Sequence, residues 1–217
     1  GNKSQIEYAY LIYSLVYNLE PKNILEIGTA RGFSAAVIAK ALHDCGAENS
    51  KVVSHDIHNP EDKKNWHANK LGNVDPFKGK ILSLIEIWSK FDKSNTLRNK
   101  IEFRSNSLKE SISKLDNKID FVFIDGDHTY EGVKNDFEMI ESSLSPNAII
   151  LFDDYFHGTS YEIFNFIKQR SMKLRADFGL YGLKKYVDEL ICKGDYISWI
   201  PSTDKFKRIN LIIKKQI

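Results

Sequence analysis

The chain has 217 residues, of which 42% are hydrophobic and 28% charged, and its formal net charge is +2. These values fit one α/β domain with a sizeable core, and they argue against a basic nucleic-acid-binding face and against a membrane-spanning helix. Cys45 and Cys192 show neither metal-ligand spacing nor disulfide-framework density and, with no signal peptide, favour a cytoplasmic location.

Apolar segments predict strands and helices in alternation. The predicted helices are residues 5–19, 32–45, 108–115, 130–144 and 182–193. The predicted strands are residues 23–28, 51–57, 100–105, 119–125, 147–154, 195–201 and 208–215. All-apolar strands that alternate with helices indicate a Rossmann-like, doubly wound, mostly parallel seven-stranded sheet with helices on both faces. The last two strands are joined by a short turn, which predicts a C-terminal antiparallel hairpin.

Two regions, 59–99 and 156–178, interrupt this rhythm within a single domain that spans residues 1–217. Connections of such length often form a lid or a binding element. Their aromatic residues could line an acceptor pocket or a dimer contact, and the sequence does not separate these uses. The residues concerned are Trp66, Trp88, Tyr155, Phe156, Tyr161 and Phe164.

The stretch LEIGTARGFS (25–34) predicts a strand, a glycine turn and the start of a helix. Gly28 and Gly32 let the backbone approach a ligand, and the helix N-terminus offers unpaired N–H groups. The G-x-x-x-G spacing differs from the dinucleotide fingerprint. Glu26 before the turn suits a ligand with an ammonium group, and Asp56 follows the second strand, where an acid can bind a ribose diol. The glycines could also serve simple helix–strand packing.

Acidic residues follow two further strands. Asp125 ends the fourth strand, and Asp153 and Asp154 end the fifth. If these strands are neighbours, the three carboxylates converge, so that either some are protonated or a cation lies between them. Oxygen ligands without a thiolate favour Mg²⁺ or a similar ion. Alternatively, Asp125 or Asp127 caps the next helix with His128 in an exposed loop; Asp127 is assigned to structure.

The order of E-x-G-x-x-x-G-x-S, an acid after the second strand, IDGDHTYEGV and LFDDY resembles class I S-adenosylmethionine-dependent methyltransferases. Within that class the chain most resembles the macrocin O-methyltransferase group, which is metal-dependent. The resemblance covers residues 22–58, 100–155 and 179–215. It implies that the donor is bound by Glu26, Gly28, Thr29, Gly32, Ser34, Asp56, Ser107 and Asp125. It also implies that Asp125, Asp153 and Asp154 hold the metal ion and that His128 is the general base.

These features together predict a Mg²⁺-dependent O-methyltransferase that acts on a small-molecule hydroxyl of a sugar or diol. One alternative is a relative that binds S-adenosylmethionine and a metal but performs different, hydroxylase-like chemistry. Others are a methyltransferase of macromolecules, which the charge balance disfavours, and a protein that only binds. The sequence predicts no nucleic-acid or membrane partner and leaves a homo-oligomer open.

Overall fold

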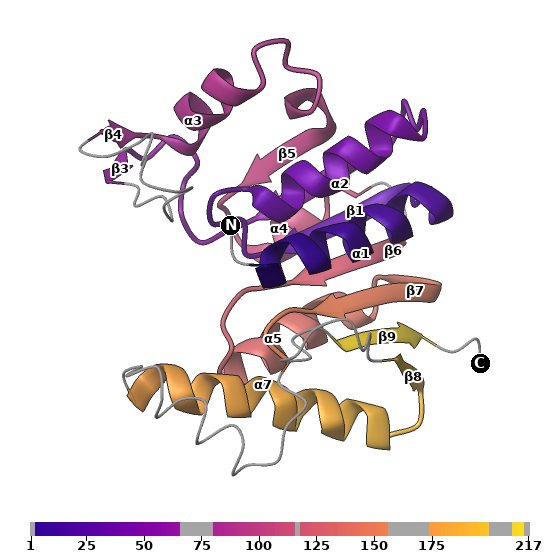
Figure 1. Ribbon diagram of the computed structural model, residues 1–217. Coiled ribbons are helices and arrows are strands. Elements are labelled where there is room, and N and C mark those ends of the chain that lie inside the picture. The colour runs from indigo at the N-terminus through magenta and orange to yellow at the C-terminus, as the bar shows by residue number, and fades with distance from the viewer. Residues whose placement is uncertain (1–2, 66–79, 116–117, 156–173, 200–209, 215–217) are drawn as a thin grey trace.

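The main sheet has seven strands with the predicted topology. The computed structural model describes residues 3–65, 80–115, 118–155, 174–199 and 210–214. The strands are β1 (Asn23–Ile27), β2 (Lys51–His55), β5 (Ile101–Arg104), β6 (Ile119–Ile124), β7 (Leu144–Phe152), β8 (Tyr196–Trp199) and β9 (Asn210–Lys214). Their order is β5-β2-β1-β6-β7-β9-β8, with β9 antiparallel to both of its neighbours (Figure 1). The remaining pairs are parallel, so the predicted Rossmann-like fold with its C-terminal hairpin is confirmed.

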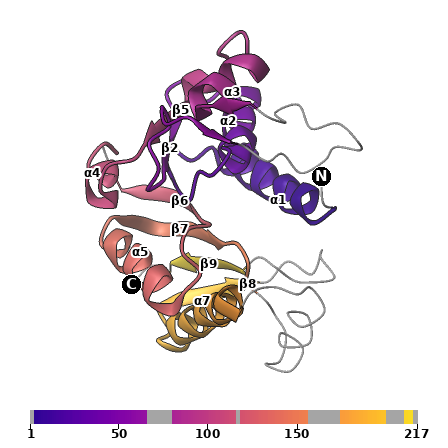
Figure 2. The ribbon, with the colours of Figure 1, turned by 90° about the vertical axis from the view of Figure 1, so that its left-hand side faces the viewer.

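Helices cover both faces of the sheet (Figure 2). On one face lie α1 (Lys3–Leu19) and α2 (Phe33–Asp44), and on the other α4 (Leu108–Ile112), α5 (Tyr130–Glu141) and α7 (Leu174–Cys192). The helix α7 begins eight residues earlier than the sequence predicts. Within the described ranges, no helix has the length and apolar character needed to cross a membrane.

Alternation along the strands divides the core into two clusters. On β6, Phe121 and Phe123 pack with α1 and α2, whereas Val122 and Ile124 pack with α5 and α7. All four side chains are at least 99% buried. The near-continuous apolar run of this strand is therefore explained by burial on both faces, as in other parallel sheets.

The described part of the region 59–99 packs against the α2 face. Two short strands, β3 (Lys64–Asn65) and β4 (Ile81–Leu82), form a separate antiparallel pair. The helix α3 (Leu84–Phe91) follows; it starts with a capping box in which Ser83 and Glu86 exchange hydrogen bonds between side chain and backbone. A single-turn 3₁₀ helix, η1 (Arg98–Lys100), leads into β5. Most of the region 156–178 lies outside the described residues.

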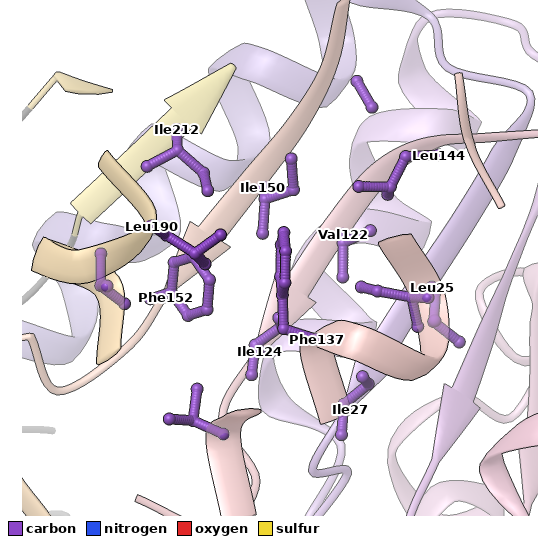
Figure 3. Packing of buried hydrophobic residues seen from close by; sticks show 14 of the residues in the cluster. Leu25, Ile27, Val122, Ile124, Phe137, Leu144, Ile150, Phe152, Leu190 and Ile212 are labelled. Carbon is purple, nitrogen blue, oxygen red and sulfur yellow. The ribbon is translucent and has the colours of Figure 1, made fainter. Parts of the chain in front are cut away.

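Phe137 of α5 links that helix to the sheet and to α7 (Figure 3). Its ring is fully buried and lies 5.6 Å from the ring of Tyr196, 6.0 Å from Phe152 and 6.1 Å from Tyr186. We expect Phe137→Ala to lower the free energy of unfolding by about 3–5 kcal/mol, because a large buried ring is lost and a cavity remains. Urea denaturation measures the change. Met139→Ala on the same helix is the control, since Met139 is 46% exposed and its truncation should cost little; equal losses in both variants would contradict this account of the core.

Candidate functional site

The predicted donor residues follow β1 and β2 at one edge of the sheet. The amide of Gly28 donates a hydrogen bond of 2.8 Å to the carbonyl of His55, and the amide of Asp56 donates one of 2.9 Å to Arg104. Each bond continues the parallel ladder one residue beyond the strand ends. The two residues are thereby held in fixed positions at the carboxyl edge, where open α/β sheets bind ligands.

The glycine turn lies directly against β6. Gly28 has φ of +99°, and a Cβ atom there would lie 2.0 Å from the carbonyl oxygen of Asp125. Only glycine fits this position, because both the backbone angle and the space exclude a side chain. Since the chain runs outward from β1 to β2 and β5 and then returns to β6, β1 and β6 flank the topological switch point of the sheet. The turn is therefore at the usual ligand-binding crevice of this fold.

The second glycine of the turn makes room for an indole ring. Gly32 has φ of +74° and precedes α2, and a Cβ there would lie 2.8 Å from Nε1 of Trp88. Trp88 is 6% exposed, its ring also lies 5.7 Å from that of Phe103, and among the described residues its Nε1 has no hydrogen-bond partner. Trp88 thus packs on the glycine turn. The start of α2 has no side-chain cap, and Ser34 in its first turn is buried.

Glu26 is fully buried beneath the turn. Its Oε2 accepts a hydrogen bond from the hydroxyl of Ser54, its neighbour in register on β2, and that hydroxyl also lies 2.7 Å from the buried hydroxyl of Thr29. Within the described part of the chain, Oε1 has no hydrogen-bond partner. Burial raises the pKa of Glu26 to about 7, against the effect of the nearby hydroxyls of Ser34 and Ser54.

Ser54 is a site residue that the sequence analysis missed. The signal was available, since a serine interrupts the apolar run of β2 one residue before His55. Its partner Glu26 interrupts β1 at the position paired with it. Two polar residues at paired positions of buried parallel strands predict a hydrogen bond between them, because unpaired polar groups are costly there.

Asp56 organises the turn from the end of β2. Its Oδ2 accepts a hydrogen bond of 2.9 Å from the amide of Ala30, and its Oδ1 accepts one of 2.9 Å from the amide of His58. The carboxylate also lines a cavity of about 240 Å³, whose walls include Thr29, Phe103 and side chains of the region 59–99. The predicted donor acid is thus placed at a hollow beside the glycine turn.

Ser107, predicted to bind the donor, caps a helix in the structure. It is exposed, and its hydroxyl caps α4 by accepting a hydrogen bond of 3.3 Å from the amide of Glu110. A different serine of α4, Ser111, contacts β2: its hydroxyl lies 3.0 Å from Nδ1 of the buried His55. Burial lowers the pKa of His55. A donor contact from Ser107 remains a prediction.

The acidic residues follow β6 and β7, which are neighbours, so the condition stated for their convergence is met. The amide of Asp125 donates a hydrogen bond of 2.8 Å to Ile27, and the amide of Asp153 donates one of 3.0 Å to Ile124. These bonds place both strand ends at the same edge as the glycine turn. The strands that carry Asp125 and the Asp153–Asp154 pair therefore end side by side.

His128 lies between two of the predicted carboxylates. Its Nε2 is 3.3 Å from Oδ1 of Asp125 and 3.9 Å from Oδ2 of Asp154. Within the described residues, Nε2 forms no hydrogen bond. Asp154 has a left-handed backbone with φ of +55°, unusual for a non-glycine residue and frequent at functional sites. The structure therefore brings the predicted base together with Asp125 and Asp154.

Asp153 is buried and bonded to the backbone of its neighbour. It is 3% exposed, and its Oδ1 accepts a hydrogen bond of 2.8 Å from the amide of Asp154. In the described ranges, no three His, Cys, Asp or Glu side chains are arranged to hold a metal ion. Asp125, Asp153 and Asp154 are thus not arranged as a metal site among the described residues: the imidazole of His128 lies near Asp125 and Asp154, and Asp153 is bonded to the Asp154 amide. The predicted metal ion stays a prediction.

Asp127 and Tyr155 are structural. Asp127 accepts a hydrogen bond of 2.9 Å from the amide of Thr129, which itself caps α5. Tyr155 is 2% exposed, and its hydroxyl donates a hydrogen bond to Asp188 of α7. Of the predicted acceptor-pocket or dimer aromatics, Trp88 and Tyr155 are therefore buried in the domain. The other four, Trp66, Phe156, Tyr161 and Phe164, lie outside the described residues.

The sequence and the fold match known methyltransferases. Residues 25–155 match the family model of the methyltransferase domain. The uncharacterized protein y4gI of Sinorhizobium fredii is 26% identical over 141 residues, which are 64% of this chain and 14% of the relative. The chain spans 20% and 14% of the lengths of the curated relatives it matches.

Solved structures share the fold at low identity. The methyltransferase PaMTH1 of Podospora anserina matches with a TM-score of 0.64 and 17% identity, over 96% of this chain and 78% of that one. An O-methyltransferase of Bacillus cereus matches with a TM-score of 0.60 and 17% identity, over 96% and 81%. These structures share the fold of the chain, and the family model supports the methyltransferase that the sequence predicted. The chain belongs to the methyltransferase domain family; the closer resemblance to the macrocin group stays a prediction.

The burial of Glu26 predicts a pH-dependent stability. Its pKa is raised from 4.5 to about 7 in the folded protein, so the proton is held more tightly when folded. The stability that this group contributes is present below about pH 4.5 and is lost as the pH rises through about 7, at a cost of about 3 kcal/mol. We expect Glu26→Gln to gain stability over the wild type as the pH rises, measured by urea unfolding at about pH 5 and about pH 8.

The comparison of Glu26→Gln with the wild type isolates the effect of ionising Glu26 on stability. Asp136, whose pKa is raised to about 6 by burial and by Asp127, titrates in an overlapping range. Because Asp136 is present in both proteins, its effect cancels in the difference. If the unfolding free energies of Glu26→Gln and wild type differed by the same amount at both pH values, ionisation of Glu26 would not destabilise the folded protein.

Proposed function

We propose that the protein transfers the methyl group of S-adenosylmethionine to a hydroxyl oxygen of a small-molecule acceptor. The observation that carries the proposal is the position of His128, next to two carboxylates and at the sheet edge that holds the Gly28 turn. Family membership supports methyl transfer. The two solved structures are described as bound to S-adenosylhomocysteine, the demethylated donor, which supports the same donor for this chain.

The donor pocket is proposed along β1 and β2. An ammonium group of the donor beside Oε1 of Glu26 would offset the cost of ionising that buried carboxyl. The uncapped start of α2 offers N–H groups to the donor carboxylate. Asp56 keeps lone pairs for the ribose hydroxyls, since each of its oxygens accepts a hydrogen bond from one backbone amide and a carboxylate oxygen has a second lone pair.

The chemistry proposed for the site is a direct transfer. His128 takes the proton of the acceptor hydroxyl as the oxygen attacks the methyl carbon; the O–C bond forms and the C–S bond breaks. The electron pair of the broken bond stays on sulfur, which leaves neutral S-adenosylhomocysteine and a methyl ether. Asp125 and Asp154 place negative charge beside the imidazolium that results. Orientation of the two substrates supplies the remaining acceleration.

Magnesium has no step in this proposal. If bound, a divalent ion would lower the pKa of a coordinated hydroxyl and so assist the same proton removal. Among the described residues the three carboxylates are not arranged to hold such an ion as they lie. The Mg²⁺ requirement that the family resemblance implies is therefore kept as a separate prediction.

The role of His128 is testable by His128→Asn. We expect the rate of methyl transfer to fall about 10²- to 10⁴-fold, because the general base is lost. Binding of S-adenosylmethionine should be unchanged, since the proposed donor contacts come from β1, β2 and α2. The measurements are transfer of labelled methyl to a panel of sugars and catechols, and calorimetry with the donor. His43→Asn, at an exposed position near the end of α2, is the matched control.

Each arm can contradict the proposal. No heat with S-adenosylmethionine or S-adenosylhomocysteine would remove the methyltransferase reading, and label that accumulates only in macromolecules would favour the alternative acceptor class. Full activity of His128→Asn would show that His128 is not the general base. The same assay with a chelator should leave the rate unchanged if the side chains stay as they lie; a loss that Mg²⁺ restores would confirm the metal predicted from the sequence.

A further inference from the structure

We infer that α7 is the positioning element of the catalytic group, and that it sets the distance between His128 and Asp154 by holding the chain segments that carry both. This inference rests on the proposed role of His128. Neither segment is part of a strand or helix at the residues concerned: His128 lies between β6 and α5, and Asp154 follows β7. The ladder of the sheet reaches Asp125 and Asp153 but not these two residues, whose segments also contact α7.

The first contact holds the backbone of His128. The amide of Leu183, in the middle of α7, donates a hydrogen bond of 3.1 Å to the carbonyl oxygen of His128. Gly182 makes this approach possible, because a Cβ there would lie 2.3 Å from the amide nitrogen of Tyr130 and 3.0 Å from the carbonyl carbon of Thr129. These are backbone atoms that cannot move aside cheaply. Any side chain at position 182 therefore separates α7 from the His128 segment.

Further contacts hold α7 against the start of α5; we call this interface the α5–α7 seam. The hydroxyl of Tyr130 donates a hydrogen bond of 2.5 Å to Glu189, and its ring lies edge-on to that of Tyr186 at 5.7 Å. Residues 182, 186 and 189 recur at helical spacing, so one side of α7 faces the start of α5. The seam is continuous over two helical turns.

The second contact holds the residue next to Asp154. The hydroxyl of Tyr155 donates a hydrogen bond of 2.5 Å to Oδ1 of Asp188, and Lys184 pairs with the same carboxylate while lying 5.2 Å from the Tyr155 ring. Tyr155 is 2% exposed, so its position is fixed by packing as well as by the bond. Both catalytic segments are thus attached to a single rigid helix, which converts two loops into one preorganised group.

Two substitutions test the inference at its two contacts. Gly182→Ala should lower kcat about ten- to a hundredfold while the dissociation constant of S-adenosylmethionine stays within about twofold, because the base moves and the donor pocket does not. Asp188→Ala should act likewise. Asp188→Asn should recover most of the rate, since its amide oxygen still accepts the bond from Tyr155. Cys192→Ser, at the exposed far end of α7, should match the wild type.

Two readouts need no activity and separate this inference from the proposed function. Hydrogen exchange at the Leu183 amide should quicken in Gly182→Ala, and the imidazole ¹⁵N signals of His128 should shift in Gly182→Ala and Asp188→Ala but not in Cys192→Ser. If the wild type transferred no methyl group, these measurements would still decide the positioning role. Unchanged His128 signals, an Asp188→Asn no better than Asp188→Ala, or donor affinity that falls in parallel with kcat would overturn the inference.

Discussion

The site depends on the continuation of the parallel hydrogen-bond ladder one residue past the end of each strand. The amides of Gly28, Asp56, Asp125 and Asp153 each bond to the last carbonyl of the adjacent strand. Because parallel strands end at a common edge, this register carries a glycine turn and three acids to neighbouring positions without any contact between distant loops. A shift of one residue in β6 would turn Val122 and Ile124 to the other face and remove Asp125 from the edge.

The same arrangement concentrates acidic groups in a poorly solvated place. Glu26 is fully buried, Asp153 nearly so, and Asp125 contributes to the raised pKa of Glu26. Such charges oppose folding unless they are bonded or neutralised. Glu26 accepts a hydrogen bond from Ser54, and Asp153 accepts one from the Asp154 amide. His128 lies between Asp125 and Asp154. The site thus holds groups that lower stability, and the proposed cationic donor and proton transfer would account for them.

The sheet could be predicted from the sequence because its strands are mostly apolar and its turns carry glycine or acids. The same pattern placed Asp125 and Asp154 at strand ends, but that β6 and β7 are neighbours came from the structure. The different surroundings of Asp153 and Asp154 could not be predicted, because two adjacent acids at a strand end look alike until the backbone at Asp154 takes its left-handed turn. Nor could the sequence show that Trp88 packs on Gly32, or that Gly182 contacts the Tyr130 backbone, since both are contacts between segments far apart in the chain.

The most direct test of the central claim is a crystal structure of the protein with S-adenosylhomocysteine. The account predicts that the ligand lies across the ends of β1 and β2, with its ammonium group toward Glu26. Its sulfur should face the same space as Nε2 of His128, so that one acceptor oxygen could reach both. A ligand bound elsewhere, or a sulfur separated from His128 by packed side chains, would contradict it.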